Sequence, residues 1–158
     1  MTAPEKLLLI PKIPEGIVID HIPAGFGLQI LDIILRYPGM NEAVASVGLN
    51  YTSCKLGKKD MIKLQEIEDL PPQALAHIAV LCSGVSVKRV KDYKVEKKFV
   101  VAPPDLMVGQ ARCRNPGCIT NHERDVVSRF RRVPGEGKRY KCAFCERIFS
   151  LGELEIIA

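Results

Sequence analysis

The sequence has no long hydrophobic segment among its 158 residues. The apolar run Leu7–Ile10 is preceded by Glu5 and stopped by Pro11, so it is too short for a transmembrane helix and unlike the core of a secretory signal. These absences argue against a membrane protein or a secreted one. We therefore expect a protein of the reducing cytoplasm, in which Cys54 and Cys82 are free thiols.

The sequence is also poor in recognisable catalytic machinery. His77 and His122 have no evident nucleophile or carboxylate arranged around them. No Gly-x-Ser-x-Gly motif occurs, and Gly57-Lys58 lacks the upstream glycine and the following Ser or Thr of a phosphate-binding P-loop. We therefore expect no hydrolytic activity, although lysines could bind a polyphosphate without cleaving it.

The net charge of +5 is modest and decides little about partners. Both parts of the chain carry a small excess of lysine and arginine, and a metal ion held by four thiolates would offset that excess in the second part. A hydrophobic content of 47% with 26% charged residues is typical of a globular protein of one ordinary domain or two small ones.

Four of the six cysteines form two close pairs. Cys113 and Cys118 have four residues between them, Cys142 and Cys145 have two, and 23 residues separate the pairs. Two such knuckles can complete the tetrahedral shell that Zn²⁺ accepts from sulfur. A closed shell leaves no open position for substrate, so we expect one structural zinc ion. Two disulfides and a rubredoxin-like iron site are the alternatives.

Hydrophobic periodicity in the first two thirds of the chain predicts an α+β domain. The order strand, helix, strand, strand, helix, strand is that of a ferredoxin-like βαββαβ fold, an antiparallel sheet with two helices on one face, here extended by a further strand. Residues 57–60 are expected to form a turn, and residues 7–13 an irregular or edge segment. The predicted strands are 17–22, 43–51, 61–67, 85–91 and 95–101, and the predicted helices are 26–37 and 69–83.

The most linker-like point is Ala102-Pro103-Pro104, which predicts domains at 1–104 and 105–158. The second domain has β-like runs at 126–133 and 139–141 and few large apolar side chains. We expect it to be a small all-β, zinc-ribbon-like domain that requires its metal ion to fold.

Lysines crowd neighbouring strands of the predicted sheet. Such lysines can simply protect an edge strand from aggregation, and Asp20-His21 at a strand end can simply cap a turn. Together, however, these groups could flank an anionic ligand at one edge of the sheet. The basic residues are Lys88, Arg89, Lys91, Lys94, Lys97 and Lys98 in one region and Lys58, Lys59 and Lys63 in another.

Several segments carry a resemblance to a known family. They are Val18-Ile19-Asp20-His21-Ile22-Pro23-Ala24, Gly48-Leu49-Asn50, Gly57-Lys58-Lys59-Asp60-Met61-Ile62-Lys63 and the two cysteine knuckles, which close with Lys141-Cys142-Ala143-Phe144-Cys145-Glu146 and Phe149. In this order they resemble the regulatory chain of aspartate carbamoyltransferase, over essentially the whole chain after Leu9. The resemblance is specific, because many zinc ribbons share the knuckles but not the preceding domain.

The resemblance implies a non-catalytic subunit with a nucleotide-effector domain followed by a zinc domain that docks on catalytic chains. In the family, two regulatory chains pair through their effector domains, and three such dimers bridge two catalytic trimers in a dodecamer that serves pyrimidine biosynthesis. The implied effectors are CTP, ATP and, in some members, UTP. The resemblance places Ile10, Ile13, Val18, Tyr93 and Val95 on the side of the base, Asp20 and His21 at the ribose or phosphate, and Lys63 and Lys98 at ribose and triphosphate oxygens, with Lys88 in the same site.

Two other readings remain open from the residues. A zinc-ribbon protein could bind nucleic acid through arginines, but the second part of the chain is near neutral once the metal cluster is counted, and an aromatic stacking platform is lacking. A free-standing zinc enzyme is disfavoured by the closed four-sulfur shell. The arginines in question are Arg112, Arg114, Arg124, Arg129, Arg131, Arg132 and Arg139.

Overall fold

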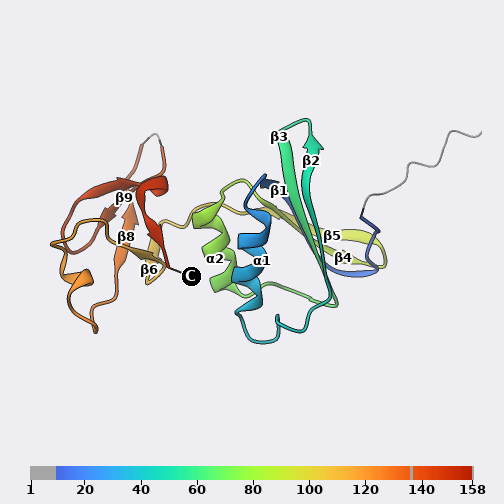
Figure 1. The fold of residues 1–158 in the computed structure, drawn as a ribbon, viewed down its shortest axis with the longest axis horizontal. Helices are drawn as coiled ribbons and strands as arrows, with labels where there is room; N and C mark the ends of the chain where they lie inside the picture. Colours follow the sequence, from blue (N-terminus) through green and yellow to red (C-terminus); the bar gives the residue numbers. More distant parts are fainter. Residues whose placement is uncertain (1–9, 136, 158) are drawn as a thin grey trace, which may run out of the picture.

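The structure is a computed structural model that describes residues 10–135 and 137–157. Figure 1 shows a larger α+β domain beside a smaller all-β domain. The first residues of the predicted lead-in, Leu7–Leu9, lie outside the described residues, and residues 10–13 form no strand. No helix in the described part of the chain is long and apolar enough to cross a membrane.

The first domain has the predicted ferredoxin-like fold. Its sheet has the strand order β2-β3-β1-β4-β5, every neighbouring pair is antiparallel, and both helices cover the same face (Figure 1). The further strand that was predicted is present as β5, and it lies at one edge of the sheet. The elements are β1 (Glu15–Pro23), α1 (Gly27–Leu35), β2 (Ala45–Ser53), β3 (Gly57–Gln65), α2 (Pro72–Leu81), β4 (Ser86–Lys91) and β5 (Lys94–Val100).

An isoleucine-rich core joins the sheet to the helices. In β1, Ile17 and Ile19 point to the helix side because side chains of a strand alternate between its faces. In α1, Ile30 and Ile34 are one helical turn apart and are fully buried against them. The β-branched run and the apolar helix that the sequence contains thus form the two layers of one core.

The predicted turn at residues 57–60 is wrong. Gly57–Asp60 form the start of β3, and the turn lies at residues 54–56. Lys58 and Lys59 pair with Thr52 and Tyr51 of the edge strand β2. Lysines are frequent near sheet edges, so the polar composition of this segment did not signal a turn.

The second domain is all-β, as predicted. A four-stranded sheet has the order β10-β9-β8-β6, and β11 pairs with β7 in a second, two-stranded sheet. The predicted run at 139–141 is a strand, whereas only the later part of 126–133 is, because Val126 lies in a turn closed onto Glu123. The strands are β6 (Leu106–Val108), β7 (Ala111–Arg112), β8 (Arg129–Arg132), β9 (Arg139–Cys142), β10 (Ile148–Ser150) and β11 (Glu155–Ile156), with short 3-10 helices at Ile119–Asn121 and Leu151–Glu153.

Helix α2 connects the two domains. Its Val80 is buried within the core of the second domain, where it joins Phe130 and Tyr140, among others. The Tyr140 hydroxyl also donates a hydrogen bond of 2.8 Å to the carbonyl of Pro104, between the domains. A cleft of about 500 Å³ is lined from both sides, by Phe26, Val80, Leu81 and Ser83 and by Lys138, Ser150, Leu151, Gly152, Leu154 and Ile156.

The contact made by Val80 yields a stability prediction. Val80→Ala removes two methyl groups from a buried interdomain position and should lower the free energy of unfolding by about 1–3 kcal/mol. Urea unfolding followed by circular dichroism measures this change. Val44→Ala is the matched control, because Val44 is 61% exposed and should change stability by less than about 0.5 kcal/mol. Equal effects of the two substitutions would show that Val80 does not support the domain contact.

Candidate functional site

The four paired cysteines converge on one point. Their sulfur atoms all lie within 4.8 Å of one another, with 3.6 Å between those of Cys113 and Cys145 and 3.8 Å between those of Cys118 and Cys142. Sulfur atoms bound tetrahedrally to zinc at about 2.3 Å are about 3.8 Å apart, whereas a disulfide bond is about 2.05 Å long. The cluster therefore has the geometry of a metal site, and all six cysteines are free of disulfides.

Backbone turns hold the knuckles in place. In the first, Asn115 accepts hydrogen bonds from the N–H of Gly117 through its side chain and from the N–H of Cys118 through its carbonyl. The Asn121 amide donates to the carbonyls of Cys113 and Asn115, at 2.9 and 2.8 Å. The second knuckle begins at Cys142, the last residue of β9, and the Glu146 N–H closes its turn by donating a hydrogen bond to the carbonyl of Cys142. The Asn-Pro-Gly sequence thus folds locally into the turn that brings Cys113 and Cys118 together.

The environment of the thiols favours a bound cation. Burial raises the pKa of Cys113 and Cys142, so these thiols resist losing their protons. Burial also opposes ionisation of Cys145, but hydrogen bonds from the Arg147 N–H, the Asn115 side chain and neighbouring thiols outweigh it and lower its pKa to about 7. Four thiolates this close together, three of them buried, require a compensating positive charge, so metal binding must accompany proton release.

A second group of predicted site residues lies on the sheet face opposite the helices. Val18 of β1 pairs with Lys63 of β3 on one side and with Lys88 of β4 on the other, and Lys88 pairs with Lys98 of β5. Directly paired residues share a face of the sheet. These four side chains therefore form one row across four strands, about 14 Å wide at the usual strand spacing.

A small apolar patch lies beside this lysine row. Ile13, Val18 and Val90 are buried together, with Met61 packed against them, in a cluster separate from the main core. Val95 pairs with Val90 but is 56% exposed. Tyr93, at the turn before β5, is 62% exposed, and its N–H donates to the carbonyl of Pro14.

Asp20 lies beneath the lysines, only 5% exposed. Its carboxylate accepts hydrogen bonds from Lys59 at 2.8 Å, from Lys88 at 3.3 Å and from the N–H of His21 at 2.7 Å. Burial opposes ionisation, but these donors and the lysine charges together lower the pKa of Asp20. Lys59 is one of the lysines that the sequence offers for an anionic ligand, but the family resemblance does not place it in the nucleotide site. Its alternation with Met61 and Lys63 along β3 is the signal that places it on this face.

Lys63 and His21 make further hydrogen-bonding contacts on this face of the sheet. The Lys63 ammonium donates to the carbonyl of Pro11 at 2.7 Å and approaches that of Ile10 at 3.5 Å, so it holds the N-terminal lead-in against the sheet. Burial lowers the pKa of Lys63, and Asp20 opposes that effect. The His21 ring lies 3.2 Å from the Ser86 hydroxyl, and burial likewise lowers the pKa of His21.

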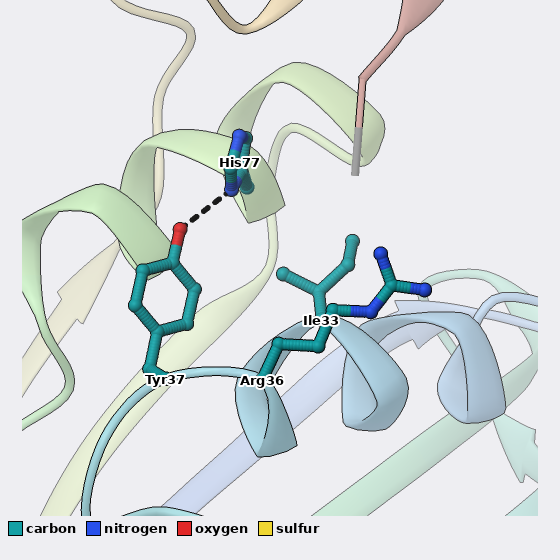
Figure 2. A pocket seen from close by; sticks show the side chains of 4 residues that line it. All are labelled: Ile33, Arg36, Tyr37 and His77. Carbon is teal, nitrogen blue, oxygen red and sulfur yellow. Dashed lines mark hydrogen bonds between the residues drawn. The ribbon is translucent and has the colours of Figure 1, made fainter.

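A separate cavity lies between the helices, on the other side of the domain. Figure 2 shows the Tyr37 hydroxyl directed at His77, with 2.6 Å between the hydroxyl and Nδ1. Ile33 and Arg36 complete the lining of this cavity, whose volume is about 110 Å³. Burial, together with the Arg36 charge, lowers the pKa of His77. The hydrogen bond between Tyr37 and the neutral imidazole of His77 links the segment that follows α1 to α2.

The fold and the two sites define a two-domain protein in which a ferredoxin-like domain with a lysine-rich sheet face precedes a small metal-binding domain. Models of two families match the chain: the aspartate carbamoyltransferase regulatory chain, allosteric domain, over residues 8–102, and the metal binding domain of the same chain over residues 106–155. The chain therefore belongs to the aspartate carbamoyltransferase regulatory chain family and is a non-catalytic subunit. This confirms the resemblance seen in the sequence.

Similar proteins cover nearly the whole chain. The aspartate carbamoyltransferase regulatory chain of Thermofilum pendens is 41% identical over 154 residues, which are 97% of this chain and 94% of the relative. The protein of the same name from Pyrococcus abyssi is 40% identical over 151 residues, which are 96% of this chain and 97% of the relative. The similarity therefore includes both domains.

Replacement of one cysteine of the cluster tests the metal site. Cys118→Ser should reduce the bound metal from one ion per chain to well below one, because a serine hydroxyl is a poor ligand beside three thiolates, and the second domain should lose its fold. Elemental mass spectrometry and circular dichroism measure the two effects. Cys82→Ser is the control, since Cys82 is a buried cysteine outside the cluster. A Cys118→Ser chain with full metal content would contradict the four-sulfur site.

Proposed function

We propose that this chain regulates the catalytic chain of an aspartate carbamoyltransferase by binding nucleoside triphosphates. Residues 1–104 form the effector domain, which takes CTP, ATP or UTP, and residues 105–158 form a domain that holds one structural zinc ion and docks on the catalytic chain. The protein works in the cytoplasm, within pyrimidine biosynthesis. The proposal extends the family membership to particular ligands and partners.

The row of Lys63, Lys88 and Lys98 beside an apolar patch is the observation that supports a nucleotide site. Lys88 and Lys98 face each other across neighbouring strands, where like charges repel unless an anion lies between them. Lysine is a point charge on a flexible stem, which suits the mobile oxygens of a triphosphate. The apolar patch can accept the base, which needs contact area and few charges.

The other residues take roles that follow from their places on this face. Asp20 binds Lys59 through one carboxylate oxygen and Lys88 through the other, and so orients both at the ribose or phosphate end of the site. His21, held near Ser86, belongs to the same end. The nucleotide base lies against a further group of residues, some of which contact it through backbone groups. They are Ile10, Ile13, Val18, Tyr93 and Val95.

Nucleotide binding would shift the assembled enzyme between states of low and high activity. A coupling free energy of about 1–3 kcal/mol is typical, and active-site ligands must then change nucleotide affinity by the same factor. The assembly comprises two catalytic trimers bridged by three regulatory dimers. The burial of Val80 in the metal-binding domain supports mechanical coupling, because α2 contributes to the cores of both domains.

Calorimetry of the full zinc-loaded chain tests the nucleotide site. CTP should bind at one site with a Kd in the micromolar to millimolar range, corresponding to about −4 to −8 kcal/mol, and a short DNA duplex should not compete. Lys63→Met and Lys98→Met should each weaken binding by about tenfold, because each removes a charge-assisted hydrogen bond. Lys141→Met, in the metal-binding domain, should leave the affinity unchanged. Equal affinities of all variants, or displacement by the duplex, would refute the site.

Removal of the metal tests the docking role of the second domain. Chelation should release the regulatory chain from the catalytic chain in size-exclusion chromatography, because the docking surface loses its fold with its zinc. Restoring zinc should restore co-elution, whereas magnesium, which prefers oxygen ligands, should not. Co-elution that persists after complete loss of zinc would disprove the role of the metal in docking.

A further inference from the structure

Two β-bulges flank the same point of β3. The register of β1 on β3 shifts between Ile19 and Ile22, and the register of β2 on β3 shifts between Gly48 and Tyr51. Each bulge contains a non-glycine residue in the left-handed region, His21 at φ 57° and Asn50 at φ 60°. This conformation is uncommon for residues other than glycine, although Asn and His adopt it more readily than most, and contacts with neighbouring groups stabilise it.

A carboxylate satisfies the N–H of each of these residues. Asp20 accepts from His21, and Asp60 accepts from Asn50 at 2.9 Å. The second oxygen of Asp60 accepts from the N–H groups of Gly25 and Gly27, at 3.0 and 2.9 Å. Asp60 is only 1% exposed and thus ties β3 both to the bulge of β2 and to the start of α1.

Close packing leaves little freedom around this carboxylate. A Cβ atom at Gly27 would lie 2.8 Å from the Cβ of Asp60 and 2.9 Å from its Oδ2. The approach of α1 to β3 therefore depends on a glycine at that position. Because glycine has no side chain, the Asp60 carboxylate has room to accept hydrogen bonds from the N–H groups of both Gly25 and Gly27.

The bulge in β2 determines which way Tyr51 faces. A shift of one residue in a strand inverts the faces of all side chains beyond it. With the bulge, Tyr51 pairs with Lys59 and lies over Gly48, where an added Cβ would overlap both the Tyr51 ring and Ile10. Tyr51 therefore packs beside the lead-in whose carbonyls accept from Lys63.

We infer that Asp60 is a positioning residue for the nucleotide site, acting from the opposite face of the sheet. Asp60 stabilises the bulge of β2 that places Tyr51 and the N-terminal lead-in beside Lys63. It also fixes the part of β3 that carries Lys59, the partner of Asp20. This inference rests on the proposed function, because the ligand whose site is positioned is the proposed nucleoside triphosphate.

Asp60→Asn in the full zinc-loaded chain separates positioning from simple electrostatics. Removal of a negative charge would by itself strengthen the binding of an anion. Loss of positioning should instead weaken CTP binding by about tenfold, since about 1.4 kcal/mol corresponds to that factor. CMP, which lacks the outer phosphates, should lose less affinity, so the ratio of CTP to CMP affinity should fall. Destabilisation alone would leave this ratio unchanged in the folded, metal-loaded fraction.

Asp69→Asn is the matched control, because Asp69 is an exposed carboxylate that pairs with Arg89 at 3.5 Å. It should not weaken CTP binding. Asn50 offers a second test of the same link. Asn50→Gly keeps the N–H and tolerates positive φ, so it should bind CTP normally. Asn50→Pro removes the N–H and cannot adopt the positive φ of the bulge, so it should lose affinity as Asp60→Asn does.

Amide exchange in the unaltered protein gives a readout that does not depend on any variant folding. CTP should slow the exchange of the Asn50 and Gly27 N–H groups, which donate hydrogen bonds to Asp60. These groups are not on the sheet face that is proposed to bind the nucleotide. Unchanged exchange under saturating CTP, or an Asp60→Asn chain that binds CTP as tightly as the unaltered protein, would overturn the inference. An unaltered chain that binds neither CTP nor CMP would overturn the proposed function itself, and this inference with it.

Discussion

Charge compensation within the four-cysteine cluster is the constraint on which the second domain depends. Three of the four ligand cysteines are buried, and the domain has a small core around Met107, Phe130 and Tyr140. A core of this size rarely stabilises a domain alone, so the free energy of metal binding must supply much of its stability. Val80 of α2 enters that same core. The metal site therefore also determines how firmly the first domain is attached to the second.

One face of the sheet in the first domain carries both charged and apolar groups. The face opposite the helices combines a row of lysines with a buried carboxylate and a small apolar cluster. Asp20 neutralises part of the lysine charge from below, which leaves an excess of positive charge directed outward. A polyanion with an apolar group attached fits both features. The helix face, by contrast, is a continuous isoleucine-rich core whose role is to hold that sheet rigid.

The bulges in β1 and β2 allow apolar side chains to face the core and polar side chains to face the other side of the sheet. Without its bulge, β1 would direct His21 toward the core and Ile22 away from it, whereas Ile22 is in fact fully buried. The bulges thus satisfy the core and the polar face at once, and two carboxylates satisfy the N–H groups of the residues at positive φ. Asp60 lies on the helix side of the sheet, yet it accepts a hydrogen bond from the N–H of Asn50, in the bulge that precedes Tyr51. The backbone geometry of the two bulges is therefore linked through β3.

Features that depend on residue spacing and periodicity can be predicted without the structure. The cysteine intervals predicted the cluster, the order of apolar segments predicted the ferredoxin-like domain, and the motifs around Asp20 and Lys63 indicated the family. Features that depend on contacts between residues distant in the chain became apparent only in the folded protein. Residues 57–60 resembled a turn because their strand partner, Tyr51–Ser53, was not apparent from composition. Alternation along β3 indicates the face of Lys59 but not its contact with Asp20. The roles of Asp60 and Val80 depend on register and burial across long sequence separations, and no local pattern encodes those contacts.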